Sequence, residues 1–184
     1  MSLTNNIQQI LKELEENSKK LSDNQASLVL KNILKAKHIF LAGAGRSGLA
    51  VKGFANRLLH LGFDVSIVGE ISSPHSHEGD MVIICSGSGE TPSLKGLAEK
   101  AKKGGLSISL ITMAENSSIG NLADSKIILP GRIKTDSEGE QSIQPMGSAF
   151  EQMAFILFDA LVLDLMTELQ ETSETMFARH ADFE

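Results

Sequence analysis

The stretch Ile83-Ile84-Cys85-Ser86-Gly87-Ser88-Gly89-Glu90-Thr91-Pro92 decides the fold of this chain. An apolar run ends in a loop of alternating serines and glycines, and a helical pattern follows at once. Glycines let backbone N–H groups turn toward an anion, hydroxyls add donors, and a helix N-terminus adds partial positive charge. The stretch therefore predicts a strand, a phosphate-binding loop and a helix, with the phosphate held by Ser86, Gly87, Ser88 and Thr91.

Thr91 also has a purely structural interpretation. It precedes Pro92, and this pair is typical of a helix N-cap followed by proline at the first helical position. A capping hydroxyl still faces the helix N-terminus, so both interpretations can hold. Glu90 is unusual beside an anion, and we expect its carboxylate to point away from the phosphate.

Outward from this loop, the pattern of strand, glycine loop and helix repeats. Strands are predicted at 38–42, 64–68, 80–85, 107–112 and 125–129, and helices at 49–61, 92–103, 148–171 and 173–180. This alternation predicts an α/β fold with a five-stranded parallel sheet, doubly wound in a flavodoxin-like order, with helices on both faces.

The sheet is expected to form one domain over residues 37–184. Residues 1–36 are predicted to be an N-terminal helical segment, interrupted near Ser22, whose apolar stripe packs either on this domain or on a neighbouring subunit. Residues 131–144 show no periodicity and are predicted to be a long exposed loop.

Composition narrows the functional classes. The chain has 184 residues and a net charge of −6, which argues against non-specific binding to nucleic acid or to an anionic membrane. It begins without a signal-peptide pattern and has one cysteine, Cys85, so we expect a reducing, cytoplasmic location. Because Cys85 ends a buried strand, we expect a packed thiol and not a nucleophile.

A second glycine loop, Gly43-Ala44-Gly45-Arg46-Ser47-Gly48, matches the dinucleotide fingerprint, with Glu70 lying 22 residues beyond Gly48. The polar Arg46 and Ser47, the second phosphate-type loop and the short chain argue against a dinucleotide. We expect this loop to shape a smaller site through Gly45, Arg46 and Ser47, although a purely structural glycine turn stays open.

Three further positions have competing interpretations. Glu151 follows Ser148 by three residues, so it either completes a capping box or serves as a general base. His180 is either a lone surface histidine or a functional one. His75 and His77 have ligand-like spacing but no further ligand nearby, so no metal site is expected.

These segments, with residues 54–62, 144–152 and 173–181, resemble the sugar isomerase (SIS) domain superfamily and, within it, the 6-phospho-3-hexuloisomerase family over essentially the whole chain. The most specific parts are Pro145-Met146-Gly147-Ser148-Ala149-Phe150-Glu151 and the ending Arg179-His180-Ala181. The final Asp182-Phe183-Glu184 differs slightly from the Asn-containing ending usual in that family.

The resemblance implies interconversion of D-arabino-hex-3-ulose 6-phosphate and D-fructose 6-phosphate, following a hexulose-phosphate synthase in formaldehyde fixation by the ribulose monophosphate pathway. It also implies cofactor-free homotetramers. Another SIS isomerase, acting on arabinose 5-phosphate or sedoheptulose 7-phosphate, and a non-catalytic sugar-phosphate sensor remain alternatives.

The resemblance makes Glu151 and His180 the catalytic candidates. Moving the carbonyl requires a cis-enediolate, for which Glu151 is the expected base and His180 the acid. Arg46 or Arg57 would stabilise the enediolate charge. Because His180 lies on a terminal helix, we expect a composite active site at a subunit interface.

Overall fold

The computed structural model describes residues 2–131 and 142–182, and its centre is a five-stranded sheet in the order β2-β1-β3-β4-β5. All four strand pairings are parallel. The strands are β1 (Ile39–Gly43), β2 (Val65–Ile67), β3 (Met81–Cys85), β4 (Ser107–Thr112) and β5 (Ser125–Ile128). The predicted α/β class and flavodoxin-like order are confirmed.

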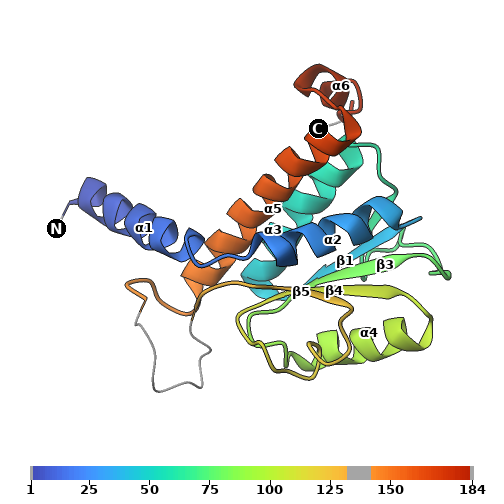
Figure 1. Ribbon diagram of the computed structural model, residues 1–184, viewed down its shortest axis with the longest axis horizontal. Coiled ribbons are helices and arrows are strands. Elements are labelled where there is room, and N and C mark those ends of the chain that lie inside the picture. Colours follow the sequence, from blue (N-terminus) through green and yellow to red (C-terminus); the bar gives the residue numbers. More distant parts are fainter. Residues whose placement is uncertain (1, 132–141, 183–184) are drawn as a thin grey trace.

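Helices cover both faces of this sheet unequally, with α2, α3 and α5 on one face and α4 on the other (Figure 1). The β2–β3 and β4–β5 connections contain no helix, which leaves α4 alone on its face. The helices are α1 (Leu3–Ser18), α2 (Asp23–Lys35), α3 (Gly45–His60), α4 (Pro92–Lys103), α5 (Ser148–Leu169) and α6 (Ser173–Phe177).

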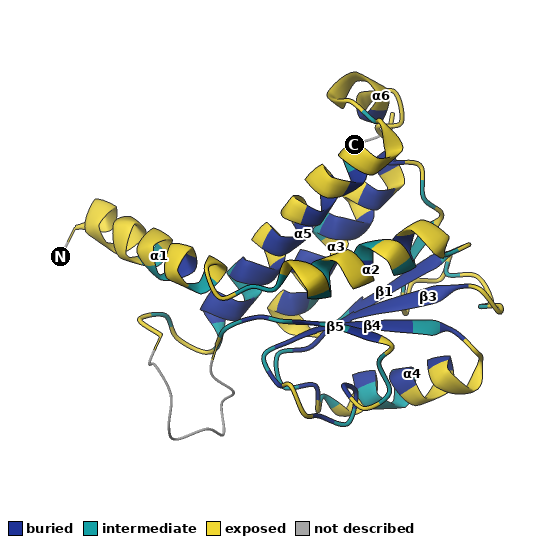
Figure 2. Cartoon of the chain, in the orientation of Figure 1, coloured by how far each residue is buried: buried dark blue, intermediate teal, exposed yellow. Residues whose placement is uncertain are grey.

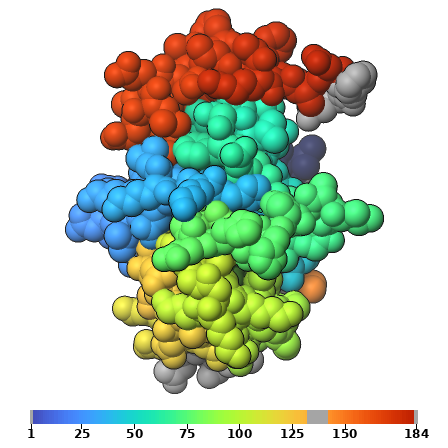
Figure 3. All heavy atoms as spheres, turned by 90° about the vertical axis from the view of Figure 1, so that its right-hand side faces the viewer, coloured from blue at the N-terminus to red at the C-terminus, as the bar shows by residue number. Residues whose placement is uncertain are grey.

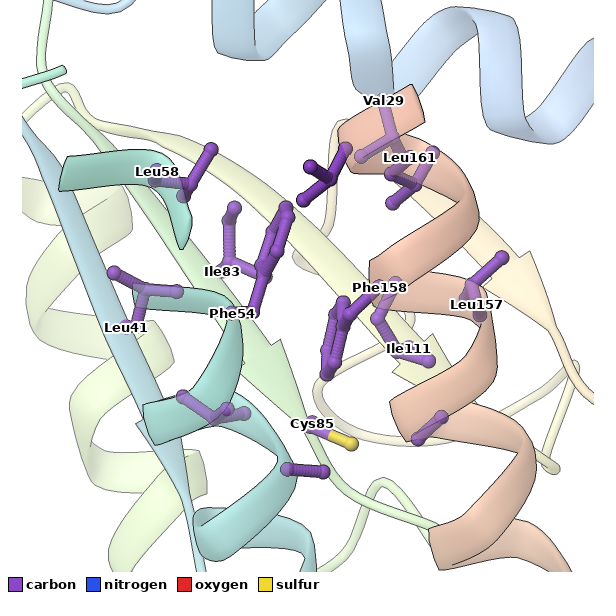
Figure 4. Packing of buried hydrophobic residues seen from close by; sticks show 14 of the residues in the cluster. Val29, Leu41, Phe54, Leu58, Ile83, Cys85, Ile111, Leu157, Phe158 and Leu161 are labelled. Atoms are coloured by element: carbon purple, nitrogen blue, oxygen red, sulfur yellow. The ribbon is translucent and has the colours of Figure 1, made fainter. Parts of the chain in front are cut away.

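The larger core lies between the sheet and the pair α3 and α5 (Figure 4). Phe54 of α3 and Phe158 of α5 stack there with ring centroids 4.6 Å apart. Leu41 and Ile83 line the sheet side, and Cys85 is completely buried among them. This packing fixes α3 and α5 as neighbours that run side by side from the carboxyl edge of the sheet.

The N-terminal helices differ in how they are held. On α2, the Gln25 side chain accepts a hydrogen bond from the Ile128 N–H (2.9 Å), and Asn32 donates to the Ser125 hydroxyl (3.0 Å), so this helix packs on the edge strand of its own sheet. By contrast, α1 projects from the body and is exposed on most of its circumference (Figures 1 and 2). Packing of α1 on a neighbouring subunit stays a prediction.

Two predicted boundaries are those of the loop at 131–144 and of the helix after the glycine loop at 43–48. Most of the long loop expected at 131–144 lies outside the described residues. The expected glycine loop ends early, because α3 already begins at Gly45 and not at Leu49. A Cβ atom on Gly43 would lie 2.9 Å from the Gly48 nitrogen, so the strand and the helix approach too closely for any longer side chain. Arg46 and Ser47 consequently belong to the first helical turn.

Candidate active site

Three helices begin at the carboxyl edge of the sheet. The N-terminus of α3 follows β1, that of α4 follows the loop after β3, and that of α5 lies against α3 through the contacts of Arg46. Each N-terminus carries partial positive charge and N–H groups without helical partners. Parallel sheets bind ligands at this edge, beside the point where the strand order reverses. The arrangement suits an anionic ligand in a protein of negative net charge.

The serine–glycine loop after β3 is built around the buried hydroxyl of Ser86. This oxygen accepts a hydrogen bond from the Gly89 N–H (3.2 Å) and lies 3.3 Å from the Thr91 hydroxyl. Thr91 occupies the N-cap position of α4, but its side chain makes no capping hydrogen bond. The Ser86 and Thr91 hydroxyls therefore lie together at the start of α4, and Ser88 lies between them in sequence.

Side-chain hydrogen bonds join the loop to neighbouring segments of the chain. The Glu90 carboxylate turns to the next segment, where it accepts hydrogen bonds from the Ser118 N–H (2.6 Å) and hydroxyl (2.8 Å). These bonds, with a weaker contribution from Lys95, lower the pKa of Glu90. The Gly87 carbonyl accepts from the Thr112 hydroxyl (3.1 Å). These hydrogen bonds join the loop to the end of β4 and to the segment that follows it.

Glu151 lies in the first turn of α5 and forms an ion pair with Arg46, whose Nε is 3.0 Å from Oε2. Among the described residues this buried oxygen has no hydrogen-bond partner, so the contact with Arg46 is electrostatic and poorly aligned. The guanidinium Nη1 donates to the Ser148 hydroxyl at 2.9 Å. Two residues 102 positions apart in the sequence are joined here.

The capping-box interpretation of this segment is wrong. Gly147, and not Ser148, occupies the N-cap position, and it adopts a left-handed conformation with φ of +83°. The Ser148 hydroxyl donates to the Pro145 carbonyl (2.8 Å), and the Glu151 side chain reaches Arg46. Neither side chain caps the helix, so the Glu151 carboxylate is available for chemistry.

The start of α5 and the serine–glycine loop lie close together. The ring of Phe150 lies 3.4 Å from the position that a Cβ on Gly87 would take. Burial raises the pKa of the Cys85 thiol to about 12; a hydrogen bond from Ser47 opposes this, and the nearby charge of Glu151 adds to it. Cys85 is therefore a neutral packed thiol at the floor of the site, as expected, with Ser47 and Glu151 as its neighbours.

His180 and Arg57 lie at the C-terminal end of α3, away from Glu151. The His180 ring stacks on the ring of His60, the last residue of α3, with centroids 5.2 Å apart. The Arg57 Nη1 atom lies 3.4 Å from Nδ1 of His60. Arg46 is in the first turn of that helix, about 20 Å away at 1.5 Å per residue. In Figure 3 the C-terminal residues (red) cover the end of α3 (turquoise). One chain therefore does not bring Glu151 and His180 together.

A cavity of about 380 Å³ adjoins the site between the first turns of α3 and α4. Gly43, Gly48 and Ser93 line it, and Lys52 pairs with Glu70 (3.5 Å) at its edge. Its lining residues include neither Glu151 nor Ser86, so these two candidate groups lie outside the cavity. Its size is in the range typical of small-molecule sites.

Residues 2–131 and 142–182 contain no group of three or more metal-ligating side chains. His75 and His77 contact each other edge to face, with centroids 5.1 Å apart, without a third ligand. Over the same described residues, no helix combines the length and apolarity needed to cross a bilayer.

The sequence did not reveal the role of Ser148 as the partner of Arg46. Its only signal was the spacing to Glu151, which suggested a cap. The remaining candidates divide into two groups: Gly45, Arg46 and Ser47, in the first turn of α3, lie near Glu151, whereas Arg57 and His180 lie at the far end of α3.

Known proteins similar to this chain identify its family. The SIS domain model matches residues 32–161. The chain is 47% identical to the 3-hexulose-6-phosphate isomerase of Bacillus subtilis, covering all of both chains, and 35% identical to that of Mycobacterium gastri, covering 99% of this chain and 92% of the relative. A solved Methanococcus jannaschii protein, for which the same function was inferred, superposes with a TM-score of 0.80 at 32% identity and 96% coverage of both chains. The chain therefore belongs to the SIS domain family and, within it, to the 3-hexulose-6-phosphate isomerases.

Proposed function

We propose that this protein interconverts D-arabino-hex-3-ulose 6-phosphate and D-fructose 6-phosphate, the activity also named 6-phospho-3-hexuloisomerase. The relatives' names supply the substrate, because 47% identity over the full length joins this chain to an enzyme of that name. The observation that carries the proposal is the Glu151 carboxylate, paired with Arg46 beside a preformed hydroxyl loop at three helix N-termini.

The phosphate is assigned to the loop after β3. The hydroxyls of Ser86, Ser88 and Thr91 and the N-terminus of α4 provide donors and partial positive charge. The glycines of this loop let it pack closely on its surroundings: a Cβ on Gly87 would meet the Met113 side chain, and one on Gly89 would meet Ser117. Binding energy at the distant phosphate group fixes the reacting carbons without taking part in the chemistry.

Glu151 is assigned as the base. In the direction of fructose 6-phosphate, its carboxylate removes the proton from C2, the electron pair forms the C2–C3 double bond, and the C3 oxygen gains the charge of an enediolate. The same carboxyl group then returns the proton to C3, while a proton moves from the C2 oxygen to the C3 oxygen. Arg46 lies on Glu151 at 3.0 Å and places positive charge where the enediolate forms.

His180 is assigned as the acid between the two oxygens, acting in the site of a neighbouring subunit. The distance along α3 excludes it from the Glu151 of its own chain. Arg57 lies beside His60, near His180, and would contribute to the same site of the neighbouring subunit. Apolar side chains exposed on three helices offer contacts for that neighbour: Leu3, Ile7 and Leu11 on α1, Leu49 on α3, and Phe155, Ile156 and Leu163 on α5. A homotetramer is part of this proposal.

The substrate must be supplied by a reaction that joins formaldehyde to ribulose 5-phosphate, which makes hexulose-phosphate synthase the pathway partner. No cofactor is needed, because the reaction moves protons within one molecule. A cytoplasmic location completes the proposal, since the single thiol is buried and unpaired.

A coupled assay tests this function. Purified protein is incubated with hexulose-phosphate synthase, formaldehyde and ribulose 5-phosphate, and fructose 6-phosphate is measured enzymatically. We expect product only when both proteins are present. Formation of no fructose 6-phosphate, or faster isomerisation of arabinose 5-phosphate or sedoheptulose 7-phosphate by this protein alone, would overturn the assignment.

A further inference from the structure

Ser148 lies beside the assigned base without touching it. We infer that Ser148 is a positioning residue: its hydroxyl holds the Arg46 guanidinium against Glu151, at the place where the enediolate charge develops. The inference rests on the proposed function and adds a residue to it.

The Ser148 hydroxyl is oriented by the turn before the helix. It is buried, and its single hydrogen is donated to the Pro145 carbonyl oxygen at 2.8 Å. A hydroxyl has one donor and two acceptor lone pairs, so only acceptor positions remain. These face Arg46, whose Nη1 donates at 2.9 Å. The serine can therefore receive a cation and cannot compete with Arg46 for the Glu151 carboxylate.

The turn that orients Ser148 is conformationally strained. Both Met146 and Gly147 have positive φ values, +58° and +83°. A left-handed conformation is unfavourable for a residue with a side chain, and Met146 is exposed, so packing does not explain it. The consequence of this turn is that Gly147 takes the N-cap position. Ser148 moves into the helix and its hydroxyl is released from capping.

Arg46 needs such support. Its side chain is 57% exposed, and an exposed ion pair by itself holds two long side chains only weakly. The contact of Nε with Glu151 is poorly aligned, so the hydrogen bond from Nη1 to Ser148, at 2.9 Å, is the directional contact that orients the guanidinium. A charge held in place before the reaction stabilises a transition state better than one that must be reoriented.

A double-mutant cycle tests the inference. We compare the wild-type protein with Ser148→Ala, Arg46→Met and the double variant. Ser148→Ala should lower kcat about tenfold or more, because small misplacements of catalytic groups have large effects, with KM for fructose 6-phosphate changed less than about threefold since the phosphate loop is intact. In the Arg46→Met background the same change should have no further effect on kcat. Ser148→Thr, which keeps the hydroxyl, should recover most of the activity.

Two outcomes would overturn the inference: an unchanged kcat in Ser148→Ala, or the same loss of kcat with and without Arg46. A separate readout does not depend on turnover. In NMR, the Arg46 Nε–H group should be as rigid as the backbone in the wild-type protein and mobile in Ser148→Ala. An inactive wild-type protein with a rigid Arg46 would refute the proposed function and leave the positioning role standing, whereas an active one with a mobile Arg46 would refute the positioning role alone.

Discussion

Replacing Glu151 by glutamine separates its chemical role from its structural one. Glutamine keeps the size of the side chain but cannot take a proton from carbon. A positioned general base contributes about 10²- to 10⁴-fold to a rate, which is about 2.7–5.5 kcal/mol of activation free energy. Glu151→Gln should therefore lower kcat by at least a hundredfold in the fructose 6-phosphate assay. Binding of fructose 6-phosphate, measured by calorimetry, should change little because the phosphate loop is untouched.

The fold should tolerate this change. The lost ion pair joins Glu151 to an Arg46 side chain that is 57% exposed, and such pairs contribute about 0–1 kcal/mol to stability. The midpoint of thermal unfolding should consequently fall by no more than about 4 °C for a chain of this size. Glu99→Gln is the matched control, since Glu99 is an exposed carboxylate in α4, and it should retain full activity.

A Glu151→Gln variant that keeps more than about a tenth of the wild-type kcat would contradict the general-base role, since a general base contributes far more than that. An equal loss of activity in Glu99→Gln would also contradict it, because the loss would then follow from net charge. A large fall in the unfolding midpoint of Glu151→Gln would show that the carboxylate is mainly structural.

Three further predictions concern stability and accessibility. Gly89→Ala should destabilise the protein by more than about 1 kcal/mol in urea unfolding, because φ is +63° and the new Cβ would lie 2.6 Å from the Ser117 Cβ. Gly96→Ala, in the open and helical part of α4, should stabilise the protein by about 0.5–1 kcal/mol. Equal effects at both positions would contradict this prediction. Cys85 should resist a thiol reagent in the native state and react only on unfolding, because it is fully buried with a pKa of about 12; rapid labelling of native protein would contradict the buried site. Hydrogen bonds from Arg179 and Thr175 hold the pKa of Glu171 at about 2, below its usual 4.5. The stabilisation of α6 by this carboxylate is therefore complete above pH 4.5 and is lost as the pH falls toward 2, so NMR shifts of α6 residues should titrate in this range in the wild type and not in Glu171→Gln. An unchanged titration in that variant would show another cause.

The fold was accessible from the sequence because its signals are local. Apolar runs that end in Gly43 and Cys85 and continue into helices define strands of a parallel sheet without any long-range information. The start of α3 was placed four residues too late, because glycine at positions 45 and 48 suggests a loop. The close contact of Gly43 with Gly48, which determines the true boundary, exists only in three dimensions.

The site was accessible only in part. The hydroxyl loop is a continuous segment, so its residues could be named together. The pairing of Arg46 with Glu151 and Ser148 joins positions more than 100 residues apart, and no periodicity predicts it. The same pattern that suggested a capping box was misleading, because the left-handed turn at Met146 and Gly147 shifts the cap by one residue.

The proposed active site combines Glu151 of one subunit with His180 of another. Glu151→Gln and His180→Asn should each be inactive alone. Subunit exchange between them, followed through differently tagged copies, should restore activity, because a mixed pair contains one intact site. For a twofold-symmetric pair mixed at random, about a quarter of the wild-type kcat is expected. Mixed oligomers that stay inactive, or a His180→Asn variant that is active alone, would contradict the composite site.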